Sequence, residues 1–489
     1  MKDISKNILS CHVTLRDSME ALNKGVFGVV FVVNDDGSMV GLVTDGDIRR
    51  ILLSGADLSD SLEPHMNRKF IAGHTGLERS ENINLLTEKV RHIPVLDDDG
   101  RPVDMISWAE MWRLPIMEPT LAGSELKYVS DCISSNWISS QGEYIKLFER
   151  SFCDYLCVDH SLTATSGTTA LHLAIVAMGI GLGDEVIIPD LTFGASANAV
   201  IHAGAKPVMV DANSYTWTID PDVIEKKITE RTRAIMSVHL YGHPCDMDPI
   251  MEIARRHNLF VIEDCAEALG AKYKGKHVGT IGDVGCFSFF ANKVITTGEG
   301  GMVTTNNQAL FDKMNLLKNH GMAPEKRYWH LHAGFNYRMT NLQAAVGLAQ
   351  MECIYEFISN RRKMAECYRH ELEDVSGITL PPEAAWAKNI YWLYSIVIDE
   401  QKLGITRNSL ARSLLDHGIE TRPFFYPLHT QPAYSKYLHG DCFVSQKLSL
   451  YGLSLPASNH NCLKDVHRVC DTLKKTIEKS RQSQPAICV

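Results

Sequence analysis

Short apolar runs alternate with helical segments between residues 185 and 289, and this alternation limits the possible folds more than any other feature of the chain. Segments 221–228 and 247–257 have the apolar spacing of amphipathic helices. Strands that alternate with helices form parallel sheets, because each helix returns the chain to the same edge. We therefore predict an α/β fold, a mostly parallel sheet with helices on both faces. The strand-like runs are 185–188, 207–210, 234–238, 260–262 and 285–289.

The length of 489 residues predicts two or three domains, since one hydrophobic core rarely spans so long a chain. After about residue 350 the pattern changes to one long helical stretch, 348–371, and a strand-like run, 392–398, which indicates a small C-terminal α/β domain. Pro115 would end any helix that ran through segment 108–118, so we place a junction there. The expected domains are 1–112, 117–355 and 356–480, with a loose polar tail over 480–489.

The composition restricts the partners of the chain. Hydrophobic residues make up 45% and charged residues 22% of the sequence, a balance typical of soluble globular proteins. The formal net charge of −9 argues against nucleic acid as a partner, because phosphate backbones bind to basic surfaces. Thirteen cysteines lie without CxxC pairs or metal-type spacing, which favours reduced thiols in a cytoplasmic protein without a metal site. No apolar stretch reaches the length of a membrane span, so we expect no membrane partner.

An internal repeat occupies the first part of the chain. The segment 31–48 recurs 63 positions later as 94–111, and each copy predicts a strand, an Asp-Gly turn, a second strand and the start of a helix. Helical patterns precede the copies at 18–22 and 83–90. The repeat resembles a tandem pair of CBS domains, known as a Bateman module.

The CBS resemblance implies a regulatory nucleotide site. In that family a hydroxyl and a carboxylate, here Thr44 and Asp47, meet the ribose of a bound nucleotide. In the second copy Ser107 keeps the hydroxyl but Glu110 replaces the aspartate, so we expect at most one such site. A degenerate pair that serves only oligomer contacts is the alternative.

A single lysine, Lys293, lies between Ser288 and the glycine-rich segment 296–301. It follows an apolar run, and such a setting lowers the pKa of an amine that must attack a carbonyl. Asp264 ends another apolar run 29 residues upstream. An enzyme that uses pyridoxal phosphate (PLP) needs an amine for a Schiff base, a carboxylate for the pyridine nitrogen and donors for the phosphate. The two residues therefore predict a PLP enzyme that moves amino groups.

Other residues complete this predicted cofactor site. Segment 163–174 joins a small polar turn to a helical run, so the N–H groups near Gly167 and Thr168 form a candidate phosphate cradle. Phe193 follows a strand at the edge of the sheet where ligands bind, so it is a candidate to stack on the ring; a core phenylalanine, the usual place of a lone Phe, is the alternative. Ala266 is small enough to let a ring approach, and the Ser288 hydroxyl is a further phosphate donor.

Together these motifs resemble the DegT/DnrJ/EryC1/StrS family of PLP-dependent sugar aminotransferases, a branch of fold type I. The resemblance covers roughly residues 115–478. It implies that Lys293 bonds to PLP, that Asp264 faces the pyridine nitrogen and that Phe193 stacks on the ring. It also implies that Asn336 contacts the phosphate in a neighbouring subunit, and hence a homodimer or larger homo-oligomer with shared active sites. Gly167, Thr168 and Ser288 are the implied phosphate contacts.

The resemblance also implies a substrate. Segments 137–142, 326–330, 336–341 and 421–429 are most similar to members that use L-glutamate to aminate C4 of a GDP-linked 4-keto-6-deoxy-mannose. A charged side chain or histidine in these segments is equally well explained as a surface group or a satisfied histidine. The residues expected at the substrate are Trp137, Arg327, His330 and Arg422.

Three other functions stay open at this point. The first is amination of a UDP-linked keto sugar. The second is PLP-dependent sugar dehydration, which Lys293 disfavours because the dehydrating relatives carry histidine at that position. The third is a nucleotide-sensing protein with a vestigial catalytic half, which the intact Ser166-Gly-Thr segment, Asp264 and Lys293 disfavour.

Overall fold

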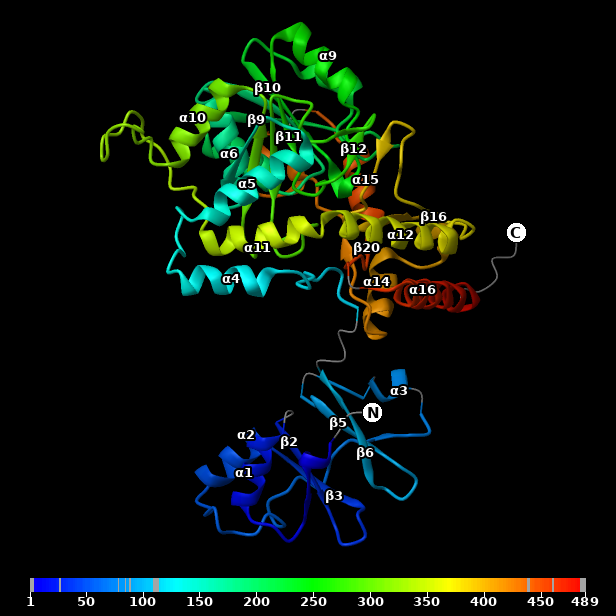
Figure 1. The fold of residues 1–489 in the computed structure, drawn as a ribbon. Helices are drawn as coiled ribbons and strands as arrows, with labels where there is room; N and C mark the ends of the chain where they lie inside the picture. The colour runs from blue at the N-terminus through cyan, green and yellow to red at the C-terminus, as the bar shows by residue number, and fades with distance from the viewer. Residues whose placement is uncertain are drawn as a thin grey trace, which may run out of the picture. The chain divides into compact units, whose positions relative to one another are not determined.

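The structure is a computed structural model that describes residues 4–25, 28–77, 79–83, 85–87, 89–108, 114–437, 440–459 and 461–483. The chain divides into two compact units, Met1–Leu114 with Ser413–Ile419, and Pro115–Arg412 with Glu420–Val489 (Figure 1). The three domain ranges expected from the sequence stay predictions. Among the described residues no helix combines the length and the hydropathy that a membrane crossing requires. Every described cysteine is a free thiol.

The first unit contains two three-stranded sheets of the same topology (Figure 1). In each sheet the first two strands run parallel and the third pairs antiparallel with the second. The second and third strands of the two sheets have the same bounds once the 63-residue shift is applied, so the repeat in the sequence is a repeat in the fold. The strands are β1 Ile8–Ser10, β2 Val29–Val33 and β3 Met39–Thr44, then β4 Gly73–His74, β5 His92–Leu96 and β6 Pro102–Ser107.

The helices of this unit partly follow the prediction. The helix α1 Leu15–Lys24 confirms the first predicted helical pattern, and α2 Asp45–Leu53 follows β3. The predicted helix 83–90 is wrong, because α3 Arg79–Ile83 ends where that range begins. The side chain of Asn82 exchanges two hydrogen bonds of 2.9 Å with the backbone of His74, which ties this segment to β4. Glu110, in the second copy of the repeat, lies outside the described residues.

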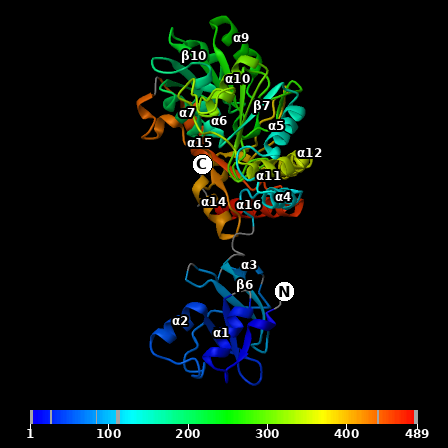
Figure 2. The ribbon, with the colours of Figure 1, turned by 60° about the vertical axis from the view of Figure 1, so that its left-hand side comes forward.

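A seven-stranded sheet forms the centre of the second unit (Figure 2). Its order is β7-β15-β14-β11-β10-β8-β9, and all pairs are parallel except those of β15, which runs antiparallel to both neighbours. The mostly parallel α/β sheet is thus confirmed, and the five predicted strands all occur. The strands are β7 His160–Ala164, β8 Glu185–Pro189, β9 Lys206–Val210, β10 Thr232–Val238, β11 Phe260–Asp264, β14 Val284–Ser288 and β15 Gly301–Thr305.

Alternate side chains of each strand pack on opposite layers of helices. Val186 and Ile188 of β8 belong to one buried cluster, and Ile187 belongs to another. Because successive side chains of a strand point to opposite faces, a strand covered on both sides is apolar throughout. The first cluster includes α6 Gly167–Ala177, α7 Ala195–His202 and α10 Gln308–Lys318, and the other includes α8 Pro221–Ile224 and α9 Met247–His257.

The C-terminal part contains an antiparallel sheet of order β16-β18-β20-β19. The helices α12 and α16 belong to the same part of the chain. The strand β18 Tyr394–Ile398 confirms the predicted run. The single long helix predicted for 348–371 is wrong, since α11 Asn341–Glu352 and α12 Ile354–Leu372 are separated at Cys353, whose φ of −100° and ψ of 0° are not helical. The other strands are β16 Ile378–Thr379, β19 Arg422–Pro423 and β20 Gly452–Leu455.

The polar tail is more ordered than predicted. The helix α16 Leu463–Ser483 includes the first residues of the range expected to be loose. Ser480 donates a hydrogen bond of 2.6 Å to the carbonyl of Gly404, and Arg481 donates to two further carbonyls, so contacts beyond the local sequence hold this end. The remaining elements are α4 Glu125–Ser134, α5 Glu143–Leu156, β12 Lys272–Tyr273, β13 Lys276–His277, β17 Ala387–Lys388, α13 Glu400–Leu403, α14 Arg407–Asp416 and α15 Phe443–Tyr451.

Candidate active site

A pocket of about 390 Å³ opens where the carboxyl ends of β8 and β11 meet the first turn of α6. Ligands bind at this edge of parallel sheets, and the volume suits a small cofactor. Segments more than 200 positions apart in the sequence contribute to it. The pocket contains most of the residues singled out in the sequence, namely Gly167, Thr168, Phe193, Asp264, Ala266, Ser288, Lys293 and Arg422.

Lys293 is largely buried in this pocket, with 14% of its side chain exposed. Burial lowers the pKa of its amine, and the carboxylates of Glu267 and Asp264 oppose that shift. Its Nζ lies 4.0 Å from the centre of the Trp392 ring, and the indole N–H of Trp392 donates a 2.7 Å hydrogen bond to the carbonyl of Asn292. The tryptophan therefore fixes the loop and covers one side of the amine. A lysine in such a place is more easily deprotonated than a surface lysine.

Asp264 ends β11 and is 5% exposed. Burial raises the pKa of its carboxyl, while hydrogen bonds from Ala266 and Ser196 and the charge of Lys293 lower it. The Ser196 hydroxyl donates to Oδ2 over 2.9 Å, and the Ala266 N–H donates to Oδ1 over 3.1 Å. Each carboxylate oxygen thus keeps a lone pair for a cationic partner, which a protonated ring nitrogen would supply.

A buried network below the pocket holds Asp264 in place. Glu263, its neighbour in β11, accepts backbone N–H bonds of 2.7–2.8 Å from Gly279, Ile281 and Gly282, and His239 lies 3.1 Å away. These hydrogen bonds and the histidine lower the pKa of Glu263 in spite of burial. His239, Glu263 and Cys265 lie close enough to hold a metal ion, but the Glu263 oxygens are already satisfied by backbone donors. We assign the cluster a structural role.

The phosphate cradle predicted from the sequence forms at the start of α6. Ser166 caps this helix and forms a capping box with Thr169, whose N–H donates to Ser166 Oγ, so the N–H groups of Gly167 and Thr168, which line the pocket, remain for a ligand. A Cβ on Gly167 would lie 2.7 Å from the Ser288 Cβ, and one on Gly301 would lie 2.4 Å from the Ser166 carbonyl oxygen. The two glycines therefore permit a close approach of backbone that forms an anion site at a helix N-terminus.

Sequence reasoning missed Glu267. This buried carboxyl lies 3.9 Å from Lys293 Nζ and accepts a 2.8 Å hydrogen bond from the backbone N–H of Tyr241. Burial raises its pKa to about 7. The feature of the sequence that could have identified Glu267 is its position three residues after Asp264, in the loop that follows the same strand. Ser196 and Trp392 were also missed. Ser196 reaches the site from α7 and Trp392 from the C-terminal part, and neither belongs to a sequence motif that indicates this role.

The raised pKa of Glu267 predicts a pH dependence of stability. The carboxyl binds its proton more tightly in the folded than in the unfolded chain, so it stabilises the fold below its usual pKa of 4.5, and this contribution is lost as the pH rises to about 7. Melting temperatures of the PLP-free chain at about pH 5 and about pH 7.5 should differ less for Glu267→Gln than for the wild type. The pH profile of kcat/KM should likewise lose an ionisation near neutrality. Identical profiles for both proteins would contradict this role.

Three predicted residues do not line the pocket. Trp137 lies in a separate hollow beside α4 and is 58% exposed. The guanidinium of Arg327 lies over the ring of Tyr328, 5.0 Å from its centre. Asn336 Oδ1 accepts a 2.9 Å hydrogen bond from Arg338 Nε. None of these residues lies in the cofactor pocket of its own chain. For Asn336 this agrees with the resemblance, which implies a contact in the neighbouring subunit.

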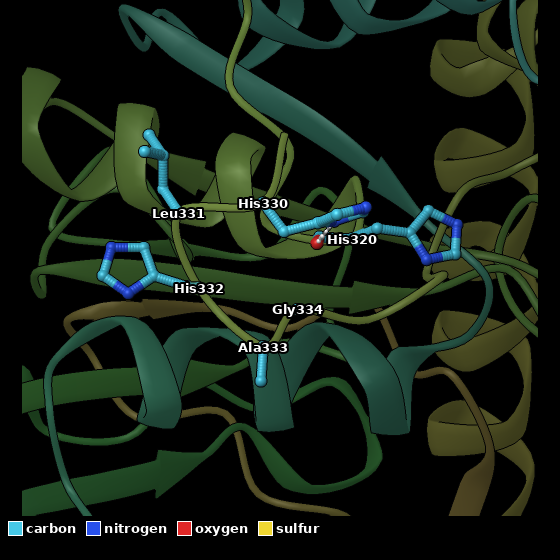
Figure 3. Close-up of a pocket in the computed structure, with 6 residues that line it drawn as sticks. All are labelled: His320, His330, Leu331, His332, Ala333 and Gly334. Atoms are coloured by element: carbon cyan, nitrogen blue, oxygen red, sulfur yellow. Dashed lines mark hydrogen bonds between the residues drawn. The ribbon is translucent and has the colours of Figure 1, made fainter. Parts of the chain in front are cut away.

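His330 lies in another separate hollow, with His320 and His332 (Figure 3). Its Nδ1 lies 2.8 Å from the carbonyl oxygen of His320. In Figure 3 the His332 ring points away from the other two imidazoles, so the three side chains do not converge on one point. The arrangement of these side chains is therefore not that of a metal centre.

In the first unit Thr44 and Asp47 have a local structural role. Each belongs to the capping box of α2, in which Thr44 Oγ1 donates to Asp47 Oδ2 over 2.7 Å. Arg50 forms an ion pair with the other carboxylate oxygen. These contacts lower the pKa of Asp47 against the effect of burial. Their place at a helix N-terminus agrees with the prediction, while the nucleotide stays a prediction.

Comparisons with known proteins agree with this site. A model of the DegT/DnrJ/EryC1/StrS aminotransferase family matches residues 119–474. The chain belongs to this family. A model of the CBS domain matches residues 1–54, and the second three-stranded sheet of this unit has the same topology as the first.

The similar proteins align with about three quarters of this chain, and the alignment spans almost their whole length. The GDP-perosamine synthase of Caulobacter vibrioides is 47% identical over 370 residues, which span 76% of this chain and 100% of the relative. That of Escherichia coli O157:H7 is 47% identical over 75% of this chain and 99% of the relative. Among solved structures, S. venezuelae DesV has a TM-score of 0.69 at 34% identity, covering 73% of this chain and 94% of DesV.

The residues of the pocket fit the cofactor of the family. A buried amine, a buried carboxylate with free lone pairs and a glycine-lined helix N-terminus match the three groups of PLP that need a partner. Lys293, Asp264 and the start of α6 would hold it, with Ser288 beside the phosphate and Phe193 beside the ring. The chain is thus a PLP-dependent sugar aminotransferase.

Proposed function

We propose that this aminotransferase moves the amino group of L-glutamate to the C4 keto group of GDP-4-keto-6-deoxy-mannose and so forms GDP-perosamine, a precursor for surface polysaccharide such as O-antigen. The observation that carries the proposal is the 47% identity to the Caulobacter vibrioides GDP-perosamine synthase over the whole of that relative. Arg422 supports an anionic acceptor, because its side chain reaches the cofactor pocket from β19.

PLP, when bound, supplies the electron sink that lets a carbon bearing an amino group lose its proton. Lys293, which lines this pocket, would be the base that takes up that proton and gives it back. Asp264 would keep the ring nitrogen protonated, and Glu267, whose pKa burial raises to about 7, lies 3.9 Å from Lys293 Nζ. Trp392 covers one side of the amine, and 14% of the Lys293 side chain stays exposed.

A panel of acceptors tests this proposal. With L-glutamate as donor, we expect kcat/KM for the GDP-linked 4-keto-6-deoxy sugar to exceed that for a UDP-linked 4-keto sugar by at least about 100-fold, because the nucleotide contacts differ. A preference for the UDP-linked sugar would mean that the proposed acceptor is wrong and that the proposed amino transfer is right. Turnover of a sugar without stoichiometric consumption of glutamate would replace amino transfer with dehydration.

We further propose that two copies of the chain share their active sites. Exposed apolar side chains gather on α4 and in the segment 328–331, which carries Tyr328 and Trp329 and lies next to Asn336 in sequence. Such surfaces are typical of interfaces between subunits. Asn336 of one chain would then complete the phosphate site of the other.

Mixing inactive variants tests this arrangement. Lys293→Ala chains and Asn336→Ala chains should each have little activity alone. Mixed dimers hold one intact site, so equal amounts should regain about a quarter of the wild-type activity after subunit exchange. No regain, with exchange shown by differently tagged chains, would contradict shared sites.

A further inference from the structure

A second cavity of about 510 Å³ lies in the second unit, and it shares no lining residue with the cofactor pocket. A small antiparallel sheet, β13-β12-β17, forms one wall, and α12 with the end of α5 forms the other. The lining residues are Tyr155, Gly270, Lys272, His277, Tyr355, Ile358, Ser359, Arg362, Lys363, Glu366 and Lys388.

The small sheet places positive charges side by side in this cavity. Lys272 of β12 lies directly opposite Lys388 of β17 and, on its other side, opposite His277 of β13. Residues that face each other across antiparallel strands share one face, and like charges in such pairs destabilise a sheet. Among the described residues no ion pair joins Lys272 or Lys388 to a carboxylate; the lysine of this hairpin that does form one is Lys274, with Asp248. An anion between them would remove this repulsion.

His277 is part of the same row and has an unmet hydrogen-bonding group. Its Nδ1 is buried without a hydrogen-bond partner in the described structure. Burial and the charges of Lys272 and Lys388 lower its pKa to about 4, so the imidazole is neutral at pH 7. Buried polar atoms in proteins rarely lack partners, and those that do mark the place of an absent ligand or water. A neutral imidazole offers such a ligand one donor and one acceptor.

Aromatic rings form the opposite wall. Tyr355, on the first turn of α12, is 73% exposed, and Tyr155 packs edge-on against it with ring centres 5.4 Å apart. Tyr155 also contacts the His277 ring, 4.9 Å between centres. Tyr355 thus presents an unstacked face beside the lysine row. An exposed aromatic face next to paired cations suits a ligand with a flat ring and a phosphate.

The remaining charges of the cavity are consistent with an anionic ligand. Arg362 is held by Glu383 at 2.6 Å and by the carbonyl of Asn389, so its charge is already compensated. Lys363, one residue later, also lines the cavity and makes no ion pair among the described residues, and Glu366 is the acidic member of the lining. The uncompensated positive charge is therefore carried by the lysines.

We propose that this cavity binds a nucleoside phosphate, with its phosphates between Lys272 and Lys388 and its base against Tyr355. The ligand is chemically related to the nucleotide part of the proposed substrate, but the site is separate from the cofactor pocket. The chain connects the two sites directly, since Gly270 of the cavity follows Glu267 of the pocket by three residues. The site is thus placed to sense a nucleotide while the active site turns over.

Isothermal titration of the full-length, PLP-loaded enzyme with GDP and with inorganic pyrophosphate tests the proposal. The wild type should show a GDP-binding event that Lys388→Glu weakens at least about tenfold, through reversal of one of two paired charges. The matched control is Lys276→Glu, the same charge change on an exposed lysine of the same sheet that does not line the cavity. Tyr355→Ala should weaken GDP binding and leave pyrophosphate binding unchanged.

Each outcome decides the proposal. Equal GDP affinities for Lys388→Glu and Lys276→Glu, or no GDP-binding event that depends on Lys388, would overturn the site. Loss of pyrophosphate affinity in Lys388→Glu with no effect of Tyr355→Ala would overturn the nucleoside part and leave a phosphate site. None of the substituted residues lines the cofactor pocket, so GDP bound there persists in every variant, and the result does not depend on which sugar the enzyme aminates.

Discussion

Lys293→Ala is expected to lower amino transfer by at least about 10⁴-fold, because one side chain supplies both the covalent bond to PLP and the proton-transferring base. The side chain is largely buried, with 14% exposed, but its amine makes no hydrogen bond in the described structure. We therefore expect the variant to fold normally. Steady-state rates with L-glutamate and the keto sugar measure the loss. Near-normal turnover would contradict the assignment of Lys293.

Chemical trapping distinguishes Lys293 from Lys318, a second buried lysine among the described residues. Lys318 is also buried with a lowered pKa, and it contacts Glu149 at 3.4 Å and the carbonyl of Thr163 at 3.0 Å. It is therefore paired, and it does not line the cofactor pocket. Borohydride reduction of the PLP-loaded enzyme followed by peptide mapping should label Lys293 in the wild type and no lysine in Lys293→Ala. A label on Lys318 would show that Lys318, and not Lys293, carries the reactive amine.

Local patterns in the sequence were sufficient for the centre of the fold and for much of the site. Strands buried on both faces are apolar throughout, so β8, β10 and β11 were recognised, and their carboxyl ends located Phe193 and Asp264. The lysine and the helix N-terminus had motifs of their own. Each of these signals depends on residues that are neighbours in the sequence.

The features that were missed depend on contacts between distant segments. Ser196 reaches Asp264 across 68 positions, and Trp392 reaches Lys293 from the C-terminal part. The break at Cys353 interrupts a helical pattern that continues through it in the sequence. Three residues earlier, Gln350 donates hydrogen bonds to the Thr120 carbonyl and to the Glu125 carboxylate, which lie more than 220 positions away. Apolar spacing alone carries no trace of such bonds, so one helix was predicted where two exist.

Replacement of Asp264 by asparagine is expected to lower kcat by about 10²- to 10³-fold and to weaken PLP binding, because an uncharged amide cannot keep the ring nitrogen protonated in a buried site. The substitution keeps the size of the side chain, so the fold should persist. Stopped-flow rates of the glutamate half-reaction and the PLP dissociation constant measure the two effects.

Ser196→Ala is the matched control for the charge of Asp264. It removes the 2.9 Å hydrogen bond to Oδ2 but leaves the carboxylate and the Ala266 donor in place. Loss of one hydrogen bond to a charged group costs about 1.5–3 kcal/mol, so its effect on kcat should be about 10- to 100-fold and smaller than that of Asp264→Asn. If the two variants were equally impaired, orientation of the carboxyl rather than its charge would be the property that the pocket requires. If Asp264→Asn kept the wild-type rate and the wild-type PLP affinity, the carboxylate would have no role at the ring nitrogen.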